Sequence, residues 1–138
     1  MYSQIQVLKR VAVIICALAL TACASYSGRG LVPSVATRPE ITAVMGEPAM
    51  AWQDADGREQ LAYPRGPEGT QTFMVFIAAD GRLERIEGVL DEKHFARIEN
   101  GRTDKDAVLR LLEPPNPRWT VYFEARDELA LEWRYCSA

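Results

Sequence analysis

The chain has 138 residues, of which 48% are apolar and 25% are charged, and its formal net charge is −3. The length suits one domain with a modest core, and the apolar content excludes wholesale disorder. The acidic balance excludes a general attraction to nucleic acid. One histidine and three cysteines argue against a histidine-rich catalytic centre and a structural zinc finger.

Residues 1–22 have the three parts of a secretory signal peptide. A polar opening ends in Lys9 and Arg10, an apolar run follows at 11–20, and small residues precede Cys23. A helix of this run would span about 15 Å, half the hydrocarbon core of a bilayer, which argues against a permanent transmembrane helix. We therefore expect residues 1–22 to be a removable signal.

The LTAC sequence at 20–23 resembles the lipobox of bacterial lipoproteins. The resemblance implies that Cys23 is lipidated and becomes the first residue of the mature chain. Ala24 and Ser25 lack the aspartate that resembles an inner-membrane retention signal. We expect a lipid anchor in the bacterial outer membrane, with the protein facing the periplasm.

The expected lipidation of Cys23 leaves one free cysteine in the mature chain. Cys16 leaves with the signal and Cys23 is blocked by lipid, so Cys136 remains as a single thiol in an oxidising compartment. It is either a reactive thiol or a small apolar residue at a strand end. No histidine lies near it in sequence, which favours the structural role.

Folded structure is expected to begin at Thr37. Residues 23–36 are mostly small and polar, which suits a lipidated flexible tether. Thr37 and Glu40 have the spacing of a capping box at the start of a helix. Gly46 can end that helix in a left-handed conformation, with Pro48 just beyond.

The apolar period then changes from that of a helix to that of strands. An Asp-Gly pair at 56–57 and the sequence Ala-Asp-Gly at 79–81 are turn signals. They predict two hairpins, with strands at 49–53, 59–63, 72–78 and 83–89.

A second unit follows the same plan. A short helix at 93–100 should stop at Gly101, and Thr103 should cap a second helix that buries Val108, Leu111 and Leu112. The proline-rich sequence at 113–117 ends that helix. Alternating apolar residues predict a final hairpin with strands at 119–124 and 129–135.

The two units echo one another. A shift of 67 residues places Val44 on Leu111 and Pro48 on Pro115. Each copy runs from a capped helix through a proline to a hairpin, which predicts an α+β fold with short helices over one face of an antiparallel sheet. The expected units are 37–89 and 90–138.

These motifs resemble the SmpA/OmlA family of BamE-like outer-membrane lipoproteins. That family carries a Gly-x-Thr sequence, a short helix, Leu-Gly-x-Pro and an aromatic W-x-Y strand. The residues that carry the resemblance are Thr37, Gly46, Pro48, Tyr63 and Gly81 in the first copy and Gly101, Thr103, Pro115, Trp133 and Tyr135 in the second. Two features depart from the pattern, because Glu113 replaces the glycine of the second copy and the last strand of that copy is missing.

The resemblance implies a non-catalytic accessory of the barrel-assembly machinery, with a protein partner there and no cofactor, metal, small-molecule substrate or nucleic acid. The family fold is similar to that of β-lactamase inhibitor proteins. A periplasmic binding or inhibitor module that acts on an envelope enzyme is therefore the alternative.

Other candidate sites have structural interpretations. His94 beside two acids reads as a solvated histidine at a helix entry, and the acids at 54 and 56 read as turn residues. The aromatic residues of 119–135 read as core packed under a helix. The strand 72–78 is apolar on both faces, so Met74 and Phe76 either contact a partner or are covered by the second unit or a loop.

Overall fold

The structure is a computed structural model that describes residues 27–66 and 69–135. Helices and strands alternate in groups along the chain. Their bounds are α2 Arg38–Met45, β1 Met50–Gln53, β2 Glu59–Arg65, β3 Gln71–Ile77, β4 Leu83–Gly88, α3 Glu92–Phe95, α4 Lys105–Leu112, β5 Val121–Phe123 and β6 Glu128–Ala130, with single 3-10 turns at Pro117–Trp119 and Glu124–Arg126.

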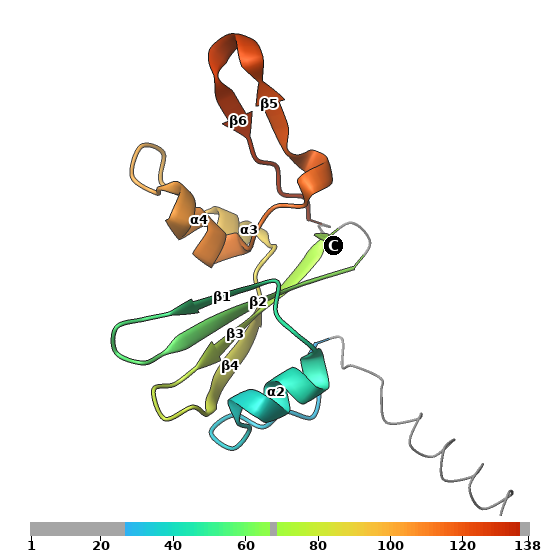
Figure 1. Cartoon of the computed structure of the whole chain (residues 1–138), viewed down its shortest axis with the longest axis vertical. Helices are drawn as coiled ribbons and strands as arrows, with labels where there is room; N and C mark the ends of the chain where they lie inside the picture. Colours follow the sequence, from blue (N-terminus) through green and yellow to red (C-terminus); the bar gives the residue numbers. More distant parts are fainter. Residues whose placement is uncertain (1–26, 67–68, 136–138) are drawn as a thin grey trace, which may run out of the picture.

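The main sheet has the strand order β1-β2-β3-β4, and each neighbouring pair is antiparallel (Figure 1). Two of its connections are the predicted turns. The Gly57 N–H donates to the Asp54 carbonyl at 3.0 Å, and the Gly81 N–H donates to the Ala78 carbonyl at 2.9 Å. Both glycines have positive φ, 87° and 79°, which glycine adopts without strain. The predicted α+β class with antiparallel hairpins is confirmed.

One face of the main sheet packs against α2. Ile41 and Met45 lie one helical turn apart and are fully buried, as the apolar spacing predicts. The helix begins as predicted, because the Glu40 carboxylate accepts hydrogen bonds from the backbone N–H and the hydroxyl of Thr37, both at 2.8 Å. The sheet contributes five further buried members of this core, which are Leu61, Tyr63, Val75, Ile77 and Leu83, and Ala36 completes it.

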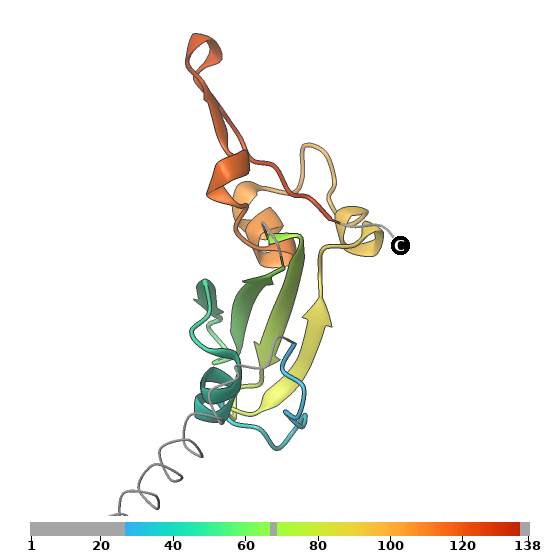
Figure 2. The same ribbon diagram turned by 90° about the vertical axis from the view of Figure 1, so that its right-hand side faces the viewer.

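The opposite face of the sheet lies against α3 and α4 (Figure 2). The Gln60 side chain donates to the Arg110 carbonyl, and the Arg110 guanidinium pairs with Asp54 at 2.7 Å. Helices therefore lie on both faces, whereas the sequence predicted them over one face only. The physical reason is β3, whose alternate residues are apolar on both sides and need cover on both.

The folded part of the chain begins before Thr37, earlier than the sequence predicted. Ala36 is buried, and its carbonyl accepts the Leu83 N–H at 2.7 Å. The Ser34 N–H donates to the Leu83 carbonyl at 2.8 Å, and Leu31 packs against the α2 core. Residues 31–36 thus lie along the edge of β4, where backbone hydrogen bonds hold them.

The second unit is shorter in its elements than predicted. The helix expected at 93–100 ends at Phe95, and Asp104 rather than Thr103 is the N-cap of α4. The Asp104 carboxylate accepts the Ala107 N–H at 2.8 Å, while the Thr103 hydroxyl accepts the Glu99 N–H at 2.8 Å and closes the loop before the helix. An ionised cap is the stronger acceptor at a helix N-terminus.

The strands β5 and β6 form a separate hairpin, which projects from the α3–α4 end of the molecule (Figures 1 and 2). Its strands are shorter than the predicted 119–124 and 129–135. The expectation that this hairpin is packed under a helix is wrong, because every residue of β5 and β6 is exposed.

In the part of the chain that the structure describes, no helix is long and apolar enough to cross a membrane. Within the same residues, no group of three or more acidic, histidine or cysteine side chains is arranged to hold a metal ion.

Candidate functional site

The two eight-residue helices α2 and α4 end in the same way. They are related by the 67-residue shift at both ends, since Arg38–Met45 maps onto Lys105–Leu112. Gly46 follows α2 with φ 82° and ψ −169°, and Glu113 follows α4 with φ 112° and ψ 171°. Each of these residues donates its N–H to the carbonyl four positions earlier, at 2.8 and 2.9 Å. The predicted positive φ at Gly46 is confirmed, and Glu113 keeps that geometry without being glycine.

An aromatic side chain holds each helix end. The buried Tyr63 hydroxyl donates to the Gly46 carbonyl at 3.1 Å, and the Trp133 indole N–H donates to the Glu113 carbonyl at 3.0 Å. Burial raises the pKa of Tyr63, so the hydroxyl keeps the proton that it donates. These two aromatic residues therefore hold the two helix ends, and Pro48 and Pro115 follow three residues after the last residue of each helix.

The other motif residues are also structural. Gly81 lies in the β3–β4 turn, and Gly101 has φ 75° in the loop between α3 and α4. The Tyr135 ring contacts the Phe95 ring, with centroids 5.1 Å apart, which ties the end of the described chain to α3.

Met74 is not available to a partner. Its side chain is fully buried in a cluster with Ala62 and Val89, on the face that lies against α3 and α4. Phe76 is partly buried, and the Arg85 guanidinium lies 3.7 Å from its ring centroid. Because Met74 is fully buried, its side chain is covered within the described part of the chain and not by a partner.

Four of the eight large apolar side chains that are exposed among the described residues lie on the β5–β6 hairpin, while Val32 and Val35 lie before α2. Val121, Tyr122, Phe123 and Leu129 are 48%, 54%, 42% and 52% exposed, and together they form what we call the hairpin surface. Tyr122 pairs with Leu129 across the strands and so shares one face with it, while Val121 and Phe123 lie on the other. Both faces of the hairpin therefore carry apolar side chains that are exposed to solvent.

The base of the hairpin is anchored to the domain. Arg134 lies over the Trp119 ring, 3.4 Å from its centroid, and Trp133 bonds to Glu113. A two-stranded hairpin alone is marginally stable in water, so these contacts hold it in position. The aromatic residues at 119 and 133–135 serve as anchors, whereas residues 121–129 are left free to contact something else.

Sequence reasoning missed the hairpin surface because alternation alone does not show whether a third strand or a helix covers a strand pair. A signal was present, since acidic and basic residues at 124, 126–128 and 132 closely flank the apolar positions. Such a density of charge suits an element surrounded by solvent better than a core strand.

Glu113 is a second feature that the sequence did not assign to a site. The residue is 2% exposed, and its Oε2 atom has no hydrogen-bond partner among the described residues. Burial raises the pKa of the Glu113 carboxyl to about 8, and the Thr72 hydroxyl beside it lowers this pKa by a smaller amount. The sequence signal for Glu113 was that it replaces the helix-ending glycine in the second copy of the motif.

The remaining candidates have structural partners. His94 is buried, not solvated as predicted, and its Nδ1 lies 2.7 Å from an Asp91 carboxylate oxygen. Hydrogen bonds from the His94 side chain and backbone hold the pKa of Asp91 below its usual value. Asp54 pairs with Arg110 and thereby fixes the β1–β2 turn to α4. Cys16, Cys23 and Cys136 lie outside the described residues.

Comparisons with protein-family models, with curated proteins and with solved structures found no match for this chain. The resemblance to the SmpA/OmlA family therefore stays a prediction from the motif residues.

Proposed function

We propose that this protein is a non-catalytic lipoprotein of the bacterial outer membrane that assists outer-membrane protein assembly or envelope integrity, in the manner of the BamE-like family. Its anchor is a lipid on Cys23, it faces the periplasm, and it acts through protein contacts made by the hairpin surface. The observation that carries this proposal is the exposure of Val121, Tyr122, Phe123 and Leu129 on a projecting hairpin.

Burial of the hairpin surface would supply part of the free energy of binding to a partner. Full burial of a large apolar side chain contributes about 1.5–3 kcal/mol, so a side chain that is already half buried has about 1 kcal/mol left. Tyr122, Phe123 and Leu129 together would contribute roughly 3 kcal/mol, about a hundredfold in Kd. Aromatic residues in a small cluster are also the composition of interface hot spots.

The position of the hairpin suits an anchored protein. The first described residues, 27–36, lie with α2 at the end of the molecule opposite the hairpin in both views (Figures 1 and 2). Residue 27 is four residues after Cys23, a reach of at most about 14 Å. A lipid on Cys23 would keep the α2 end near the membrane, so that the hairpin surface points into the periplasm.

The alternative is an inhibitor or binding module that acts on an envelope enzyme. The narrow two-stranded shape of the hairpin favours it, because such an element fits an enzyme cleft more easily than a broad sheet does (Figure 2). The two functions differ in the partner: a membrane-embedded barrel or its lipoproteins in the first, and a soluble enzyme in the second.

A paired substitution tests the proposal. Changing Tyr122 and Leu129 to serine removes one face of the hairpin surface and should weaken copurification with barrel-assembly proteins by roughly thirtyfold. Cells that carry only this variant should also become permeable to large antibiotics. The control is Arg102→Ser, an exposed side chain in the α3–α4 loop, which should leave both readouts unchanged. Normal copurification of the serine variant with barrel-assembly proteins would contradict the proposal, and retention of a soluble enzyme instead would support the alternative.

A further inference from the structure

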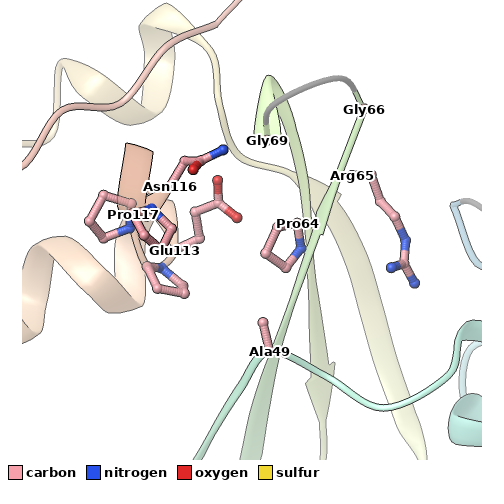
Figure 3. Close-up of a pocket in the computed structure, with 10 residues that line it drawn as sticks. Ala49, Pro64, Arg65, Gly66, Gly69, Glu113, Asn116 and Pro117 are labelled. Atoms are coloured by element: carbon pink, nitrogen blue, oxygen red, sulfur yellow. The ribbon is translucent and has the colours of Figure 1, made fainter. Parts of the chain in front are cut away.

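A pocket of about 360 Å³ lies between the end of β2, with Gly66 and Gly69, and the segment that follows α4 (Figure 3). Four prolines give it rigid apolar walls, and Glu113 is its acidic member. The residues that line it are Ala49, Pro64, Arg65, Gly66, Gly69, Glu113, Pro114, Pro115, Asn116 and Pro117.

The Glu113 side chain points into this space, between Asn116 and Pro64 (Figure 3). Its Oε2 atom is buried and has no hydrogen-bond partner among the described residues, although a buried carboxyl is costly to leave unpaired. The backbone there holds φ 112°, a conformation that side chains other than glycine rarely adopt. Backbone strain and a buried polar atom without a partner, combined in one residue, are features of ligand-binding sites.

The other charged side chain that lines the pocket does not pair with Glu113. The Arg65 guanidinium donates to the Met45 carbonyl at 2.6 Å, and its side chain points away from the pocket (Figure 3). From β3 the facing group is the neutral Thr72 hydroxyl, and from the segment after α4 it is the Asn116 amide. Among the described residues that line the pocket, none offers Glu113 a positive charge.

We propose that this pocket binds an ammonium group on a short apolar stem, with the Glu113 carboxylate as its counter-ion and the proline rings packed along the stem. The size suits a small ligand, since ligand sites begin at about 300 Å³. The same chemistry is offered by a free alkylamine and by a lysine side chain of another protein. The inference does not depend on the function of the hairpin, because the pocket and the hairpin surface share no residue.

Binding of an ammonium group is coupled to loss of a proton from Glu113. Burial raises the pKa of the Glu113 carboxyl to about 8, so most of it is neutral at pH 7 and most is ionised at pH 9. An alkylamine keeps its positive charge over this range. Because only the ionised carboxyl forms the ion pair, the affinity should rise about tenfold from pH 7 to pH 9.

The test uses the full chain in a non-ionic detergent and n-butylammonium as the probe. Carbon-13 in the glutamate carboxyl groups reports the ionisation of Glu113 by NMR, and n-butanol is the neutral probe of similar shape. We expect n-butylammonium to shift the Glu113 signal to its ionised position, to lower its pKa and to bind about tenfold more tightly at pH 9 than at pH 7. n-Butanol should do none of these.

Two variants keep the result interpretable. Glu113→Gln preserves the shape of the side chain and Glu113→Gly removes both the carboxyl and the backbone strain, so both should fold and neither should bind n-butylammonium.

A second probe, Nα-acetyl-lysine N-methylamide, distinguishes a lysine side chain of another protein from a free alkylamine. Its binding supports a lysine side chain as the natural ligand, and binding of n-butylammonium alone supports a free amine. Absence of binding by both probes, equal binding of n-butanol, or unchanged binding to the two variants would overturn the inference.

Discussion

Replacing Glu113 by glycine should stabilise this protein, because the residue combines a strained backbone with a buried carboxyl whose Oε2 atom has no hydrogen-bond partner among the described residues. A side chain other than glycine at φ 112° costs about 1–2 kcal/mol. Glycine also gives the unfolded chain more conformational freedom. This lowers the free energy of unfolding by roughly 0.5–1 kcal/mol and offsets part of the gain. The carboxyl adds a second cost, which depends on pH.

The sign of the pH dependence follows from the two pKa values. In the unfolded chain the Glu113 carboxyl loses its proton near pH 4.5, whereas in the folded protein burial raises the pKa to about 8. Between these values the folded state binds more protons than the unfolded state, so stability falls as the pH rises. At pH 7 the cost is at most about 3 kcal/mol, and water that enters the pocket makes it smaller.

Thermal unfolding of the full chain in detergent, followed by circular dichroism, measures both terms. Glu113→Gly should raise Tm at pH 7 by roughly 5–10 °C, and its advantage over the natural chain should grow from pH 4.5 to pH 8. The matched control is Gly46→Ala at the other helix end. A Cβ there meets nothing within 4 Å, so the change should cost the backbone strain of about 1–2 kcal/mol, less the roughly 0.5–1 kcal/mol that alanine gains through a less flexible unfolded chain. A lower Tm for Glu113→Gly, or a gain that does not change with pH, would refute this reasoning.

Three further predictions concern other parts of the chain. Cys23→Ser should leave an unprocessed precursor that incorporates no labelled palmitate; normal labelling would contradict a lipid at this position. Met74→Lys should lower Tm by many degrees or prevent folding, since it places an unpaired charge in a fully buried position, and an unchanged melting curve would show that this position is accessible to water. Trp133→Phe removes the donor to the Glu113 carbonyl and should lower the free energy of unfolding by about 1 kcal/mol in denaturant titration, whereas an equal stability would mean that the bond contributes nothing.

Local features of the fold could be predicted from the sequence, because neighbouring residues determine them. Thr37 and Glu40 make the expected contacts at the start of α2, and Gly46 has the expected positive φ after its end. The turn glycines at 57 and 81 are also where the sequence places them. Capping, turns and strand alternation depend on short-range geometry, which the order of residues reveals.

What covers each apolar face could not be predicted in the same way. Met74 and Tyr122 both lie in alternating apolar strands, yet the first is fully buried and the second is 54% exposed. The difference arises because the α3–α4 unit folds back over the main sheet, while nothing among the described residues folds over the β5–β6 hairpin. Likewise, the sequence places residues 31–36 in a flexible tether, whereas in the structure backbone hydrogen bonds to Leu83 hold them, and composition does not encode such bonds.

Some residues of the candidate site could be recognised from the sequence, and others could not. The motif residues were recognisable from sequence, and they prove to be structural, since Tyr63 and Trp133 each bond to the carbonyl after a helix. Glu113 was visible only as a departure from a glycine position. Its buried carboxyl and the pocket around it depend on β2 and β3, which lie some 40 to 50 residues earlier in the chain.

The central claim is that the hairpin surface is the place where this protein contacts a partner of the outer-membrane assembly machinery. The most direct measurement is crosslinking in living cells from a photoreactive phenylalanine analogue placed at position 122, with the same analogue at the exposed position 102 as the control. Mass spectrometry then identifies each crosslinked protein. We expect crosslinks from position 122 to a barrel-assembly protein and none from position 102. Absence of a specific crosslink from position 122, or the same products from both positions, would contradict the claim.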